Sequence, residues 1–157
     1  MKGKRAKTPG IGKARIRRIL VPVDFSEHSR KALQYAVDLG LVFDAEIVLV
    51  FVVEMVGYPS DLGFGQAPIP AIERELTERG KSELNRLAEE YVGGKLVVRL
   101  HVPAGRPFIE IIRAAKDLEV DLIIIATHGH TGMEHILFGS TAEKVVRKAP
   151  CPVLVVR

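Results

Sequence analysis

The stretch that decides the fold is Val120-Asp121-Leu122-Ile123-Ile124-Ile125, which runs directly into Ala126-Thr127-His128-Gly129. After a spacer of nine residues, 130–138, comes Gly139-Ser140-Thr141. The apolar run is typical of a buried strand in a parallel sheet, and the hydroxyl residues are typical of a helix start. Glycines let the backbone approach an anion, and the N–H groups at a helix start point toward it. The pattern predicts a phosphate-binding loop, and hence a nucleotide-binding module.

Outward from this stretch, apolar runs alternate with segments of helical periodicity. We expect strands over 18–23, 45–53, 95–102, 121–125 and 152–156. We expect helices from the cap Ser26 to about residue 39, with Gly40 as terminator, and over 71–91, 107–118 and 140–148. The inward stripes are predicted to include Leu33, Val37 and Leu41 in the first helix, and Ile72, Leu76, Leu84 and Leu87 in the second. Strict alternation predicts an α/β protein with an open parallel sheet and right-handed crossovers.

The composition indicates one folded unit in a reducing compartment. A chain of 157 residues can bury a core without disulfides, and the single Cys151 excludes an internal one. No apolar run approaches the roughly 20 residues of a membrane span. We expect a cytoplasmic protein that has no membrane partner.

The positive charge is concentrated at the N-terminus. Eight of the 23 basic residues lie in residues 1–18, which leaves 15 against 19 acidic residues and about −4 for the remainder. We expect a basic, flexible leader over 1–16 and one domain over 17–157. The leader could solubilise the chain or contact an acidic partner. Nucleic-acid binding by the domain is disfavoured, because it has no basic stripe with interleaved aromatic residues.

A second unusual strand end is Pro22-Val23-Asp24. Ligands of open parallel sheets bind beyond the carboxyl ends of the strands, where the strand order reverses. Asp24 is either a turn or capping residue, or an acceptor for a ligand amine or sugar hydroxyl. The chain has no Walker A motif after the glycines and no Gly-x-Gly-x-x-Gly after the first strand.

Three histidines fall near the loop: His128, His130 and His135. Zinc requires three or four converging ligands, and only Glu134 stands near them, so we favour loop solvation or phosphate contact over a protein-bound metal. Glu134 as a general base is similarly disfavoured, and no nucleophile elbow is present. We expect no catalytic residue, and at most weak ATPase activity.

Two separated motifs resemble the universal stress protein family, and the resemblance runs over residues 17–157. One motif is Ile19-Leu20-Val21-Pro22-Val23-Asp24-Phe25-Ser26, and the other is the block 126–157, with Gly139-Ser140-Thr141-Ala142-Glu143 at its centre. The resemblance implies a five-stranded parallel sheet of order 3-2-1-4-5, with four helices on both faces, of the adenine nucleotide alpha hydrolase-like type. The reversal then falls between the strands at 18–23 and 121–125.

The family's ATP binders carry Gly-x-x-Gly, nine residues, then Gly-Ser or Gly-Thr. This chain matches with Gly129, Gly139 and Ser140, whereas Ala126 replaces the first glycine. Alanine leaves room for phosphate unless that position requires a positive φ. The resemblance implies that Asp24 and Val52 meet adenine, with Pro22 and Val23 shaping that end. It further implies a ribose and phosphate lining of Ala126, Thr127, His128, Gly129 and His130, with phosphates held by Gly139, Ser140 and Thr141.

The same resemblance implies an ATP-binding sensor or regulator of the stress response with little or no turnover. A divalent cation, Mg²⁺ or Mn²⁺, would be held through phosphate oxygens. It also implies a homodimer through the last strand, 152–156, whose edge is otherwise open. Two alternatives remain: a stress protein that binds a protein partner, with Ala126 marking loss of the nucleotide pocket, and a slow ATP hydrolase or phosphotransferase using His128 or His130.

Overall fold

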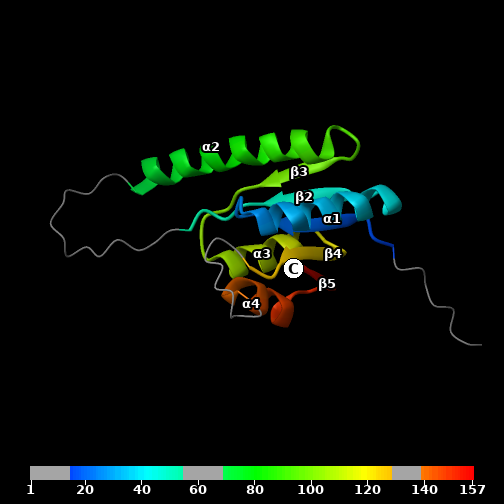
Figure 1. The fold of residues 1–157 in the computed structure, drawn as a ribbon. Coiled ribbons are helices and arrows are strands. Elements are labelled where there is room, and N and C mark those ends of the chain that lie inside the picture. Colours follow the sequence, from blue (N-terminus) through cyan, green and yellow to red (C-terminus); the bar gives the residue numbers. More distant parts are fainter. Residues whose placement is uncertain (1–14, 55–68, 129–138) are drawn as a thin grey trace, which may run out of the picture.

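The computed structural model describes residues 15–54, 69–128 and 139–157. Its centre is a five-stranded parallel sheet of order β3-β2-β1-β4-β5 (Figure 1). The strands are β1 (Arg18–Pro22), β2 (Glu46–Val50), β3 (Val98–His101), β4 (Leu122–Ala126) and β5 (Val153–Val156). The helices are α1 (Glu27–Phe43), α2 (Ile69–Leu87), α3 (Pro107–Asp117) and α4 (Ser140–Lys148), and a π-helical turn, Ala88–Val92, follows α2. The predicted fold class and strand order are confirmed.

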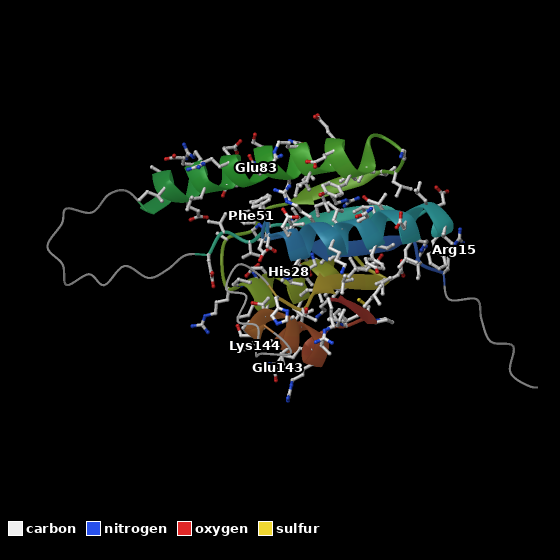
Figure 2. The ribbon with its side chains drawn as sticks, viewed as in Figure 1. Arg15, His28, Phe51, Glu83, Glu143 and Lys144 are labelled. Atoms are coloured by element: carbon white, nitrogen blue, oxygen red, sulfur yellow. The ribbon has the colours of Figure 1, made fainter. Side chains whose placement is uncertain are left out.

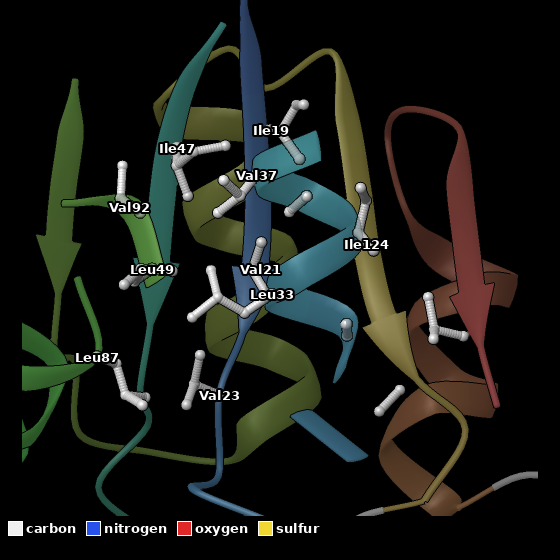
Figure 3. Packing of buried hydrophobic residues seen from close by; sticks show 14 of the residues in the cluster. Ile19, Val21, Val23, Leu33, Val37, Ile47, Leu49, Leu87, Val92 and Ile124 are labelled. Atoms are coloured by element: carbon white, nitrogen blue, oxygen red, sulfur yellow. The ribbon is translucent and has the colours of Figure 1, made fainter. Parts of the chain in front are cut away.

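The helices cover both faces of the sheet, which explains the continuously apolar strands. Alternate residues of a strand point to opposite faces. Ile19 and Val21 of β1 belong to the cluster that contains Leu33 and Val37 of α1 (Figure 3). Leu20, between them, belongs to the other cluster, with residues of α3 and α4.

The first helix runs one turn further than predicted. Ser26 is its N-cap, as expected, and its Oγ accepts a hydrogen bond from Ser29 N at 3.2 Å. Gly40 is not the terminator: it lies inside α1, where an added Cβ would stand 2.7 Å from Leu96 Cδ1. The helix ends at Asp44, whose φ of 55° is left-handed, and Leu41, predicted to face inward, is 49% exposed.

The prediction of which α2 residues face inward is only half correct. Leu84 and Leu87 are fully buried, whereas Ile72 and Leu76 are 37% and 39% exposed. Figure 1 shows that the N-terminal half of α2 reaches beyond the end of the sheet, where no strand lies beneath it. Among the described residues, no helix has the length and apolar character needed to cross a membrane.

Candidate functional site

A cavity of about 680 Å³ opens at the carboxyl ends of β1, β2 and β4 and at the starts of α3 and α4. Its volume suits a drug-sized or nucleotide-sized ligand. Every predicted site residue within the described ranges lines it: Pro22, Val23, Asp24, Val52, Ala126, Thr127, His128, Gly139, Ser140 and Thr141. Gly129 and His130, which complete the predicted set, lie outside the described residues, as do Glu134 and His135.

The parting of β1 from β4 creates the cavity. β1 pairs with β2 as far as Pro22 opposite Val50, and Val23 N then donates to Val50 O at 2.8 Å. The register between β1 and β4 ends earlier, at Leu20 opposite Ile123. The two strands diverge beyond that point, because their crossovers leave in opposite directions. This is the reversal point at which open parallel sheets bind ligands.

Asp24 has the turn role considered for it and also lies at the cavity, where the ligand role would require it. Its Oδ1 accepts hydrogen bonds from Ser26 N, at 3.0 Å, and from Ser26 Oγ, so the residue shapes the turn into α1. The half-buried residue also lines the cavity. Phe25, between these two residues, has a φ of 65°, a left-handed conformation that is costly for a large side chain. The local structure therefore fixes where the Asp24 carboxylate stands.

The two ends of the 129–138 segment are tied together by the backbone. Thr127 N donates to Val156 O at 2.9 Å, and Gly139 N donates to Thr127 O at 2.7 Å. A Cβ on Gly139 would stand 3.2 Å from Thr127 O, so this close return favours glycine. Ala126 lies within β4 and is not among the non-glycine residues with positive φ. The alanine therefore introduces no backbone strain at the first position of the glycine motif.

The start of α4 faces the same cavity. Ser140, Thr141 and Ala142 line it, and the first intrahelical bond, from Glu143 N to Gly139 O at 3.0 Å, comes after them. Gly139 is the N-cap and provides no side-chain hydrogen bond. The N–H groups of this first turn carry the positive end of the helix dipole. They form a surface suited to an anion.

His128 lies beside the cavity in contact with two neighbours. Its Nδ1 is 2.9 Å from Thr127 Oγ1, and its ring centroid is 5.9 Å from that of His28 on α1 (Figure 2). Within the described ranges, no group of three or more His, Cys, Asp or Glu side chains could hold a metal ion.

Sequence reasoning missed part of the wall. The additional lining residues are Phe25, Ser29, Val50, Phe51, Glu54, Pro107, Ile111, Ile125 and Ala142. The rings of Phe25 and Phe51 pack with centroids 4.7 Å apart. On α2, a Cβ added to Gly80 would stand 2.6 Å from Phe51 Cδ1. One of these residues, Pro107, could have been predicted from the sequence. It stands in the first turn of the helix that follows β3, and such helix starts lie at the edge of the sheet where the cavity opens.

Comparison with known proteins gives a consistent result. The model of the universal stress protein family matches residues 15–157. Universal stress protein MJ0531 of Methanocaldococcus jannaschii is 34% identical over 146 residues, which cover 90% of this chain and 82% of that protein. MJ0577 of the same organism is 30% identical over 153 residues, which cover 90% of this chain and 94% of that protein.

Solved structures share the fold. The structure of MJ0577 matches with a TM-score of 0.74 at 30% identity, and the match covers 90% of this chain and 96% of the MJ0577 chain. UspA from Lactobacillus plantarum has a TM-score of 0.74 at 26% identity, with coverages of 91% of this chain and 99% of the UspA chain.

Two structures of the same fold contain adenine nucleotides. One is a universal stress protein in complex with cAMP, with a TM-score of 0.57 at 24% identity and coverages of 90% and 97%. The other is the Archaeoglobus fulgidus protein in complex with dAMP, with a TM-score of 0.65 at 20% identity and coverages of 91% and 99%.

The family model matches nearly the whole chain, and the relatives are matched over most of their own length. The chain therefore belongs to the universal stress protein family.

Proposed function

We propose that this protein binds ATP in the cavity between β1 and β4 and acts as a stress-response sensor or regulator with little or no turnover. The observation that carries the proposal is the polarity of the cavity. The carboxylates of Asp24 and Glu54 lie at the ends of β1 and β2, and the positive end of α4 lies on the β4 side. An adenine nucleotide has the matching polarity, with amine and hydroxyl donors at one end and phosphates at the other.

At the nucleoside end, we assign Asp24 as the acceptor for the adenine amine or a ribose hydroxyl. Pro22, Val23 and Val52 supply apolar surface for the purine, and Phe51 extends that surface. Apolar walls with a few placed polar groups are the usual composition of such pockets. The cAMP and dAMP complexes of the same fold support an adenine ligand at the level of the family.

At the phosphate end, we assign Gly139, Ser140 and Thr141 to the phosphates, and Ala126, Thr127 and His128 to the ribose and phosphates. Gly129 and His130 complete this proposed set, although they fall in the segment that the structure does not describe. Mg²⁺ or Mn²⁺ would be bound through phosphate oxygens and water. Little turnover is expected, since the sequence offers no P-loop lysine and no secure general base.

Thermal unfolding of the purified protein, stripped of nucleotide, tests the proposal. A ligand that binds only the folded state stabilises it by about 2.7 kcal/mol at one hundred times its Kd. We expect the melting temperature to rise with millimolar ATP and magnesium, and to rise less with GTP at the same concentration. A melting temperature that ATP leaves unchanged would refute the proposal.

We further propose a homodimer through β5. In the described part of the chain, β5 pairs with β4 alone, and Leu154 is 37% exposed. Such an open edge is a ready template for pairing with a second chain. Light scattering should report a dimer for the wild type and a monomer for Leu154→Arg, with Arg113→Ala on α3 as control. A monomeric wild type would exclude the dimer.

The proposed location is cytoplasmic. Its support is that the sequence has a single cysteine, Cys151, and so no internal disulfide, which suits a reducing compartment.

A further inference from the structure

Lys144 is an exposed residue of α4 (Figure 2). It follows Ser140 by four residues, so the two share one face of the helix, and Ser140 lines the cavity. Helical side chains lean toward the helix N-terminus, which turns the lysine stem toward Ser140. Lys144 Nζ is 5.0 Å from the ring centroid of Phe108, the residue after the cavity-lining Pro107. Lys144 is not itself among the residues that line the cavity, but its stem begins one helical turn from Ser140, which is.

Two neighbouring arginines are paired with acids, whereas Lys144, among the described residues, is not. Arg147 Nη2 lies 3.1 Å from Glu143 Oε1, and Arg113 Nη1 lies 2.9 Å from Glu110 Oε2. No ion pair involving Lys144 occurs within residues 15–54, 69–128 and 139–157. Its contact is instead with the face of Phe108, an interaction that holds a cation weakly at an exposed site.

Lys148 makes an instructive contrast. Its Nζ also lies over the Phe108 ring, 5.7 Å from the centroid. Lys148 is in the last turn of α4, where the negative end of the helix dipole stabilises a cation. Lys144 is one turn from the positive end and four residues from Lys148, a spacing at which like charges repel. The helix itself therefore gives Lys144 no favourable electrostatic partner, whereas an anion bound at the helix start would.

We infer that Lys144 binds the outer phosphates of the nucleotide and makes the site select nucleotides with two or three phosphates over monophosphates and nucleosides. This inference rests on the proposed ATP site and deepens it. The flexible stem of lysine lets the ammonium leave the Phe108 ring and meet a phosphate as a point charge. The residue thereby sets specificity by charge, at the opposite end of the cavity from Asp24.

Calorimetric titration at fixed ionic strength, in EDTA, tests the inference with adenosine, AMP, ADP and ATP. The wild type should bind more tightly as phosphates are added. Lys144→Gln keeps the length of the stem and removes the charge, so ATP affinity should fall about tenfold, the scale of one charged hydrogen bond, while adenosine affinity changes less than about twofold. Lys144→Arg should restore most of the ATP affinity. Lys148→Gln, the matched control, should leave ATP affinity within about twofold.

The outcomes separate this inference from the proposed function. If the wild type binds ATP and Lys144→Gln binds it equally well, the inference fails and the ATP site stands. If Lys148→Gln loses as much affinity as Lys144→Gln, the effect is general surface charge and the inference also fails. If the wild type binds neither ATP nor adenosine, both the inference and the proposed function fail.

Discussion

The two ends of the sheet use polar residues in opposite ways. At the amino end, Asp121 Oδ2 accepts hydrogen bonds from the backbone N–H groups of Arg17 and Arg18, at 2.8 and 3.0 Å. Glu46 pairs with Arg18 on one side, at 3.0 Å, and with Arg99 on the other, at 2.9 Å. These groups bind one another and join β1, β2, β3 and the start of β4.

At the carboxyl end, the polar groups surround a space. Asp24, Thr127 and the first turn of α4 line a cavity of about 680 Å³. Charged groups at the amino end satisfy one another and so contribute to stability, whereas the polar groups at the carboxyl end face a cavity that we propose to bind the ligand. Substitutions at the two ends should therefore separate these properties.

The largest separation is expected from Gly139→Val. The new side chain would collide with Thr127 O, since even a Cβ would stand 3.2 Å from it, and the branched carbons would enter the cavity. We expect the ATP-induced rise in melting temperature to disappear. A folded variant that kept the full rise would show that the nucleotide binds elsewhere. Circular dichroism of the free protein provides the control for folding.

The converse change is Glu46→Gln at the amino end. The Glu46 side chain is 16% exposed and lies between two guanidinium groups, which would be left facing each other without its charge. We expect a loss of about 1–2 kcal/mol in the free energy of unfolding, with the shift caused by ATP retained. Urea unfolding measures the first quantity and thermal melting the second.

The exposed pair on α2 provides the matched control for that experiment. Glu83 is 48% exposed and pairs with Arg86 at 2.8 Å, so Glu83→Gln should cost less than about 0.5 kcal/mol. Equal losses in Glu46→Gln and Glu83→Gln would contradict the structural role assigned to the amino end.

A more modest effect on binding than that of Gly139→Val is expected from Asp24→Asn, which sharpens the comparison within the cavity. The asparagine Oδ1 can still accept the hydrogen bonds from Ser26, so the turn should form and the melting temperature of the free protein should change little. Adenosine and ATP affinities should both fall about fivefold, because the lost charge faces the nucleoside. Calorimetry would contradict the assignment if ATP affinity fell while adenosine affinity did not.

Periodicity and chain order predicted the alternating α/β architecture, because they depend on local pattern, while the resemblance to the universal stress proteins supplied the strand order and many of the residues that line the cavity. Helix α4 has the predicted bounds, and Asp24 and Ser140 meet at one cavity because the carboxyl ends of parallel strands share an edge. The errors concern tertiary contacts. Gly40 has the local signature of a helix terminator, and only its contact with Leu96 shows that close packing requires the glycine. Ile72 has the periodicity of a buried residue, but periodicity does not say how far the sheet extends beneath a helix.

The aromatic part of the cavity wall was missed for the same reason. Phe51 follows β2 directly, as Val52 does, but its packing between Phe25 and Gly80 joins three segments that are distant in sequence. No spacing rule links Gly80 to a strand end almost thirty residues earlier.

The early parting of β1 from β4 bears on how such a protein changes over evolutionary time. Because the order of the strands makes the opening, many substitutions in its lining alter what fits without closing it. A lining side chain such as that of Val52 can therefore change while the hollow persists, whereas Gly139 must stay small for the hollow to stay open. The backbone order thus provides the hollow, and the proposed roles of Asp24 and Lys144 leave the choice of ligand to a few side chains around it.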